Sequence, residues 1–198
     1  MTNPTRLRML QGTIELIRQR GINATSNREV VRFSGTPRGS LSYYFPEGRI
    51  QLLTEALGLA RTHISDRLRQ QLASEGAVRG LELFVADWEK QLQASGFSSG
   101  CPMLAAATEQ LADEACQASR LREQAKLAFQ EWQYLLAEQL CREGASAENA
   151  RALAQLTIAS FEGALALCQS EQSISPLADI TRTLTFLFTQ ATGSHHEP

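Results

Sequence analysis

Residues 20–53 read RGINATSNREVVRFSGTPRGSLSYYFPEGRIQLL, and this stretch decides the fold of the amino-terminal part of the chain. Ser26 and Glu29 have the spacing of a capping box, in which the serine hydroxyl accepts from the third helical N–H and the glutamate reaches back to the cap. A helix is therefore predicted to begin near Asn27. That helix is short, because residues 35–37 read Gly-Thr-Pro: a turn glycine, a capping threonine and a proline suited to the start of a new helix.

A second short helix is predicted over residues 37–44, which makes the pair a helix-turn-helix. The second helix of such a motif can enter the major groove of DNA with its amino-terminal residues against base edges. Arg38 has the guanidinium geometry to bind a guanine edge or a phosphate, and the hydroxyls of Tyr43 and Tyr44 can donate to phosphates. The alternative is a small helical corner in which Tyr44 and Phe45 are core residues.

The distribution of charge separates this stretch from the rest of the chain. Residues 1–49 hold eight arginines against three glutamates, a net charge of +5, whereas the remaining residues hold 11 basic and 18 acidic side chains, a net charge of −7. A basic segment joined to an acidic one is typical of a protein whose basic part alone binds a polyanion. Taken by itself, the charge is equally compatible with a solvated, arginine-rich helical surface.

Helical periodicity continues on both sides of the quoted stretch. Residues 5–20 place apolar side chains on one helical face, and Gly21 follows where a cap is expected. No stretch alternates apolar and polar residues with period two, so the predicted fold class is all-α. Further helices are predicted from residue 49 to about 72, over 77–94, from 102, and over about 113–143, 147–170 and 177–191.

Composition excludes several classes of protein. With 198 residues, 43% of them hydrophobic, the chain can bury a sizeable core without metal or disulfide support. The first residues lack the features of a secretory signal, so we expect a cytoplasmic protein. His63 has no recognisable nucleophile to pair with, so we expect no enzyme, no catalytic residue and no cofactor. The four cysteines show no metal-ligand spacing, and no metal site is predicted; they are Cys101, Cys116, Cys141 and Cys168.

Cys101 carries the alternative from another functional class. It precedes Pro102 at the start of a predicted short helix, whose amino terminus could stabilise a thiolate. The chain could then be a redox-responsive regulator or a thiol-dependent all-α protein acting through Cys101. The simpler interpretation is a packing thiol.

The quoted stretch resembles the amino-terminal signature of the TetR family of transcriptional regulators over roughly residues 6–57. Together with the Pro46 insertion, GCPM at residues 100–103 and FEGAL at residues 161–165 are similar to the LmrA/YxaF-like branch of that family. The resemblance implies an α-helical homodimer with one helix-turn-helix per subunit. It also implies a carboxy-terminal domain that binds an inducer and pairs with its twin through the last two long helices.

The resemblance predicts the domains and the function. We expect a helix-turn-helix DNA-binding domain at 1–48, a larger helical ligand-binding and dimerisation domain at 49–192, and a disordered tail at 193–198. The expected protein is a repressor of a palindromic operator in double-stranded DNA, released by a small hydrophobic or aromatic effector. Ser42 stands where the family commonly has tyrosine, and Tyr43 is the candidate substitute. The predicted DNA-binding residues are Ser26, Asn27, Arg28, Thr36, Pro37, Arg38, Gly39, Ser40, Tyr43, Tyr44 and Arg49.

Large apolar side chains and small residues on the later helices supply the remaining candidates. The expected effector is flat and aromatic with little negative charge, because the acidic domain would repel an anion, and Glu109 is one of few polar groups expected near it. The predicted ligand-binding residues are Phe84, Trp88, Phe97, Cys101, Met103, Phe129, Trp132 and Phe161. The predicted dimer-interface residues are Leu153, Leu156, Ala159, Gly163, Ala164, Leu184 and Leu187.

Overall fold

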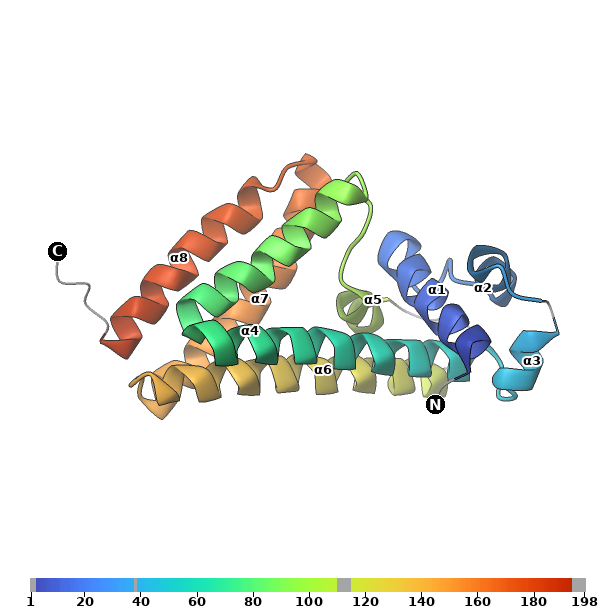
Figure 1. Cartoon of the computed structure of the whole chain (residues 1–198), viewed down its shortest axis with the longest axis horizontal. Helices are drawn as coiled ribbons and strands as arrows, with labels where there is room; N and C mark the ends of the chain where they lie inside the picture. The colour runs from blue at the N-terminus through green and yellow to red at the C-terminus, as the bar shows by residue number, and fades with distance from the viewer. Residues whose placement is uncertain (1–2, 38, 110–114, 194–198) are drawn as a thin grey trace. The chain divides into compact units, whose positions relative to one another are not determined.

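A computed structural model describes residues 3–37, 39–109 and 115–193 of the chain. Within these ranges the regular elements are all helices, which confirms the predicted fold class (Figure 1). Arg38 and nearly all of the predicted tail lie outside the described residues. The helices are α1 (Pro4–Arg20), α2 (Asn27–Ser34), α3 (Ser40–Tyr44), α4 (Arg49–Ala94), α5 (Pro102–Thr108), α6 (Ala115–Arg142), α7 (Ala147–Glu171) and α8 (Ser175–Thr192).

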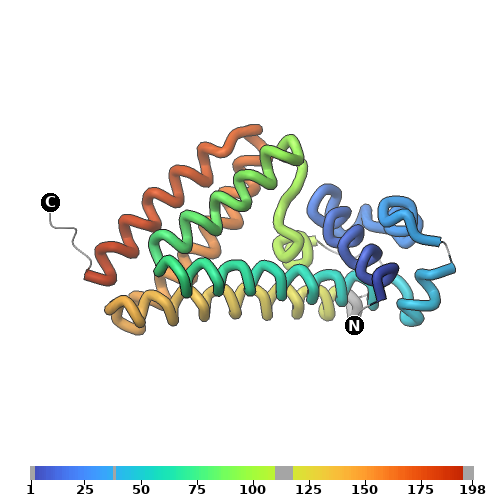
Figure 2. The backbone as a smooth tube through the Cα atoms, viewed as in Figure 1, coloured from blue at the N-terminus to red at the C-terminus, as the bar shows by residue number. Residues whose placement is uncertain are grey.

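Packing divides the chain into two compact units. The first unit consists of Met1–His63 with Ser98–Leu127, and the second unit consists of Ile64–Phe97 with Ala128–Pro198. The long helices α4 and α6 therefore contribute one part to each unit. Figure 2 traces the backbone, with colour running from the N-terminus to the C-terminus. The predicted boundary between residues 48 and 49 separates a DNA-binding domain from a ligand-binding domain by function and not by packing. It stays a prediction.

In the first unit, the ends of α1 and α2 follow from local capping. The Ser26 hydroxyl oxygen accepts a hydrogen bond from the backbone N–H of Glu29 at 3.2 Å, as the capping-box spacing predicted. The last turn of α2 ends at Gly35, which adopts the left-handed conformation with a φ of 61°. Helices α1 to α3 and the start of α4 then share one hydrophobic core, made of Met9, Leu10, Leu16, Val30, Leu41, Phe45, Leu52 and Ala56.

Helix α3 begins later than the sequence predicted. It spans Ser40–Tyr44, whereas a start at Pro37 was expected. Thr36 does not cap it: the Thr36 side chain is buried and its hydroxyl lies 2.8 Å from the hydroxyl of Ser34. The threonine therefore closes the turn after α2.

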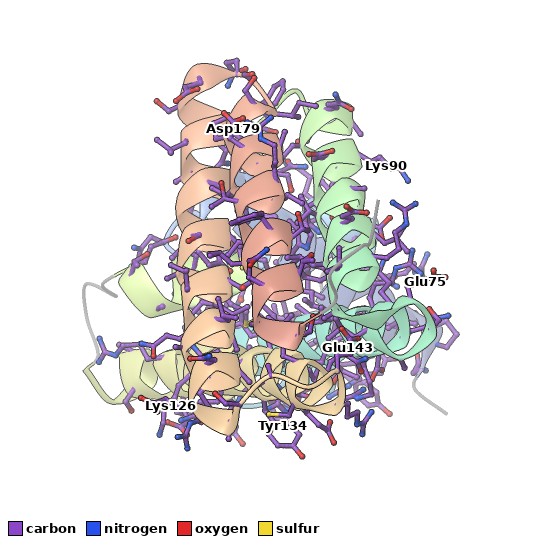
Figure 3. The ribbon with its side chains drawn as sticks, turned by 90° about the vertical axis from the view of Figure 1, so that its left-hand side faces the viewer. Glu75, Lys90, Lys126, Tyr134, Glu143 and Asp179 are labelled. Carbon is purple, nitrogen blue, oxygen red and sulfur yellow. The ribbon has the colours of Figure 1, made fainter. Side chains whose placement is uncertain are left out.

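In the second unit, α4 contains the break that the sequence placed between two helices. Gly76 has a φ of 80° and a ψ of −178°, a conformation that glycine alone adopts readily. The Glu143 carboxylate accepts a hydrogen bond from the backbone N–H of Ala77 at 2.8 Å and so caps the part of α4 that follows the break. Glu75 and Glu143 are both labelled beside this break (Figure 3). A carboxylate from α6 thus stabilises the bend in α4.

Helices α7 and α8 lie side by side in the second unit (Figures 1 and 3). Helix α7 begins at its cap Ser146, whose hydroxyl accepts from the N–H of Asn149 at 3.2 Å. Among the described residues, α7 is the helix long and apolar enough to span a membrane, with a mean hydropathy of 1.2 over 18 residues. Its Phe161 and Cys168 are buried in the unit and Glu162 lies beside them, which is the pattern of a core helix.

Candidate nucleic-acid interface

The surface of α2, α3 and the turn between them carries the predicted DNA contacts. Ser26, Arg28, Pro37 and Gly39 are exposed, and Ser40 is half-buried. Tyr43 is 79% exposed, the largest exposure among the large hydrophobic and aromatic side chains described. These residues are accessible to a DNA backbone, whereas the placement of Arg38 is outside the described residues.

Two neighbouring tyrosines at the end of α3 have different surroundings. The Tyr44 ring packs against the core of the first unit, and its centroid lies 4.9 Å from that of Tyr43 in an edge-on arrangement. Phe45 is completely buried, with the Arg6 guanidinium 5.1 Å from its ring centroid. The core interpretation is therefore confirmed for Phe45, while Tyr43 presents its hydroxyl to solvent.

Arg49 contacts the protein itself. Its Nε donates to the backbone carbonyl of Thr25 at 2.9 Å, and its Nη2 donates to that of Ile22 at 2.5 Å. Burial lowers the pKa of the Arg49 guanidinium, and the nearby Glu109 carboxylate opposes that shift. The side chain therefore fastens the loop between α1 and α2, and a phosphate would have to compete with these two carbonyls.

Two further members of the predicted set, Thr36 and Asn27, are buried or half-buried in the first unit. Thr36 is buried against Ser34, as described above. Asn27 is half-buried, and its side-chain oxygen is buried without a hydrogen-bond partner among the described residues. Such an oxygen is costly to bury, so the position tolerates asparagine at the expense of stability.

Sequence reasoning missed two exposed side chains on α2. Phe33 is 50% exposed, a large exposure for a phenylalanine side chain. The guanidinium of Arg32 lies 2.8 Å from the Glu29 carboxylate, to which Arg20 also donates at 2.9 Å. The glutamate of the predicted capping box, Glu29, therefore pairs with two arginines at the surface of the first unit. The spacing of Glu29 and Arg32 on one helix could have revealed the pair from sequence.

Comparison with known proteins identifies this arrangement. The sequence profile of bacterial regulatory proteins of the tetR family matches residues 9–56, which contain α2, α3 and the turn between them. The profile of the LmrA/YxaF-like transcriptional regulator carboxy-terminal domain matches residues 77–183, more than half of the chain. The chain belongs to the TetR family of transcriptional regulators.

Relatives of this TetR-family regulator match it along nearly their whole length. An uncharacterized HTH-type transcriptional regulator of Mycobacterium tuberculosis, Rv0196, is 34% identical over 90% of the chain and 91% of its own length. The HTH-type transcriptional regulator LmrA of Bacillus subtilis is 27% identical over 89% of the chain and 93% of its own length. The fold resembles that of a regulatory protein TetR from Rhodobacter sphaeroides, with a TM-score of 0.80, 21% identity and coverage of 93% and 99% of the two chains. The TetR-family chain is thus a DNA-binding regulator, and its relatives are regulators rather than enzymes.

In the second unit of the TetR-family chain, the predicted ligand-binding aromatics pack against one another. The ring centroids of Phe84 and Trp88 each lie 5.5 Å from that of Phe161. Trp132 is 1% exposed, donates from Nε1 to the Ser65 hydroxyl at 3.1 Å and lies 5.5 Å from the Phe129 ring. The rings fill space in this structure, as aromatic side chains at helical spacing commonly do.

The other ligand candidates have separate surroundings. Phe97 is half-buried in the second unit, with a φ of 60°. Cys101 and Met103 are buried in the first unit, 5% and 0% exposed. A redox sensor needs a thiol that oxidants can reach, so the burial of Cys101 favours the packing interpretation.

The predicted dimer residues divide between a surface and the core of the second unit. Leu156, Ala159 and Gly163 are exposed on α7, and Leu153 and Leu187 are half-buried. Ala164 and Leu184 are each 2% exposed, so they are buried in the isolated subunit. Leu167 and Phe186, which the sequence analysis did not select, are exposed apolar side chains on the same two helices.

Proposed function

We propose that this TetR-family regulator is a cytoplasmic homodimeric repressor that binds a palindromic operator and is released by a small hydrophobic or aromatic ligand. The observation that carries the proposal is an apolar surface along α7 and α8. It includes a groove of about 240 Å³ lined by Leu156, Ser160, Asp179, Ile180, Thr183, Leu184 and Leu187. A monomer gains nothing from exposing such a surface, and a second copy of the chain would bury it.

Two features support self-association through this surface. Leu156 and Phe186 are 44% and 61% exposed, a large exposure for side chains of their size. Ala159 and Gly163 are small, exposed residues one helical turn apart on α7, so another helix can approach closely there. Two copies related by a two-fold axis would present two α3 helices to the DNA, and a palindromic operator has the matching symmetry.

The ligand part of the proposal rests on the aromatic residues of the second unit. Trp88, Phe161 and Phe84 form one contact cluster, and Trp132 with Phe129 forms another. If these aromatic rings move apart, the space between them would accommodate a flat hydrophobic molecule. It releases DNA only if it binds the DNA-free conformation more tightly than the DNA-bound one.

Selection of bound sequences from a random DNA pool tests the proposed function. The expected result is an enriched palindrome, which would then serve as the operator in binding assays. Adding planar aromatic compounds should quench tryptophan fluorescence and lower operator affinity over the same concentration range. Enrichment of a single unrepeated half-site would contradict the palindrome, and a response limited to small hydrophilic anions would contradict the ligand class.

Arg38→Ala should weaken operator binding by about 1–3 kcal/mol and relax the preference at one base pair in each half-site, if Arg38 binds a guanine edge as proposed. Arg28 is the matched control, because it is an exposed arginine near the start of α2. Arg28→Ala should weaken binding to every operator sequence by about the same factor, because loss of a phosphate contact does not depend on the bases. Competition between operators changed at single positions measures both. An unchanged base preference in Arg38→Ala would show that Arg38 does not contact a base.

A further inference from the structure

The residue that ends α5 binds the loop that leads into the helix-turn-helix. One oxygen of the Glu109 carboxylate, Oε1, accepts from the backbone N–H of Ile22 at 3.0 Å. The other oxygen, Oε2, accepts from the backbone N–H of Asn23 at 3.0 Å and from its side-chain Nδ2 at 3.1 Å. Hydrogen bonds to a charged acceptor are stronger than those between neutral groups. Glu109 therefore holds two successive amides of the loop between α1 and α2.

The shape of the loop fits this carboxylate. Gly21 has a φ of 79° and a ψ of 176°, and a Cβ at this position would lie 2.2 Å from Oε1 of Glu109. No other residue type could occupy Gly21 while the carboxylate stays in place. The carbonyls of Ile22 and Thr25 in the same loop accept from Arg49. The loop is thus held through its N–H groups by Glu109 and through its carbonyls by Arg49.

The segment that leads into α5 is attached to α1 as well. The backbone N–H of Gly100 donates to the carbonyl of Arg18 at 2.8 Å, and Nε of Arg18 donates to the Ser99 hydroxyl at 3.0 Å. Both ends of α5 are therefore bonded to the end of α1 or to the loop that follows it. That loop ends at Ser26, the cap of α2. A displacement of α5 would strain these bonds or displace the start of α2.

We propose that Glu109 is a positioning residue that couples α5 to the DNA-binding helices. With the Glu109 carboxylate on the loop, α2 is held in the orientation that binds the operator; without it, the loop loosens and operator affinity falls. The bonds to Ile22 and Asn23 would then be the contacts that a ligand breaks when it displaces α5. That last step rests on the proposed release by a ligand, whereas the effect of Glu109 on DNA binding does not.

The test compares Glu109→Ala and Glu109→Gln with Glu123→Ala in the full-length protein. Glu123 is an exposed glutamate of the same unit, paired with Lys126 on the surface of α6, so its removal changes the net charge equally. By charge alone, removing a glutamate should tighten binding to DNA. The measurements are operator affinity at one salt concentration and hydrogen exchange of the amides of Ile22 and Asn23.

Glu109→Ala should weaken operator binding by about tenfold or more, against the trend from charge, and should speed exchange of the two amides by at least about tenfold. Glu109→Gln should have an intermediate effect, because its amide oxygen still accepts hydrogen bonds. Glu123→Ala should match the wild type in exchange and bind DNA at least as well. Wild-type affinity in both Glu109 variants, with their helices intact, would overturn the inference. Failure of the wild type itself to bind any enriched palindrome would instead overturn the proposed function.

Discussion

Trp132→Ala should destabilise the protein by about 3–5 kcal/mol, as expected for truncation of a fully buried aromatic residue. Trp132 is 1% exposed and packs beside Phe129 on α6, so alanine would leave a cavity in the second unit. The Ser65 hydroxyl would also lose the indole N–H that it accepts at 3.1 Å. Urea denaturation followed by circular dichroism, at one protein concentration, measures the loss.

Tyr134→Ala is the matched control for this variant. Tyr134 lies two residues further along α6, is 64% exposed and is labelled at the surface in Figure 3. Its truncation should change stability by no more than about 0.5 kcal/mol. Equal stability of the two variants would contradict the packing described for Trp132. Trp132→Phe keeps most of the buried volume, so it is the better variant for testing ligand binding separately from folding.

Leu156→Glu should convert a dimer of about twice 21.8 kDa into a monomer and weaken operator binding by about a hundredfold or more. Leu156 lines the groove on α7 and α8, and it is 44% exposed in the subunit. A glutamate there remains solvated in the monomer but would be buried without a partner in the dimer. A single subunit then binds only one half-site, without the gain from a second linked contact. Light scattering and operator titration measure the two effects.

Leu127→Glu provides the same chemical change elsewhere. Leu127 is 36% exposed on α6 and is not among the residues that line the groove. This variant should remain a dimer and keep operator affinity within a few-fold of the wild type. A dimeric Leu156→Glu protein would place the interface elsewhere. A monomeric Leu156→Glu protein that still bound the palindrome tightly would show that each subunit binds its half-site independently of the other.

The sequence predicted the helices well because their signals are local. The capping box at Ser26, the turn at Gly35 and the break near Gly76 each depend on residues within one or two helical turns. Periodicity also placed α7 and α8 within a few residues of their observed bounds. The predicted start of α3 at Pro37 was wrong. The local pattern assigned Thr36 as the cap of this helix, whereas the Thr36 hydroxyl lies within hydrogen-bond distance of the Ser34 hydroxyl and α3 begins at Ser40.

The roles of individual side chains were harder to predict, because they depend on residues distant in sequence. Glu109 was selected only as a polar group near the expected ligand, and the sequence did not reveal that its carboxylate binds the N–H groups of Ile22 and Asn23, 87 and 86 residues away. Arg49 is predicted at the DNA, and the structure adds contacts to loop carbonyls that the sequence did not reveal. No periodic pattern encodes such contacts, since each depends on how the helices pack.

The ion pairs and hydrogen bonds of the arginines in the first unit limit how strongly DNA affinity can depend on salt. Arg6 is paired with Glu55, Arg20 and Arg32 share Glu29, and Arg49 is bound to loop carbonyls. Each of these guanidinium groups already has an acceptor in the protein, so a bound phosphate would share the guanidinium with that acceptor or replace it. Fewer condensed cations are then released from the duplex than the arginine count suggests, so affinity should fall less steeply with rising ionic strength. A larger share of the binding free energy must therefore come from base edges and shape, which favours discrimination between sequences over general attraction to DNA.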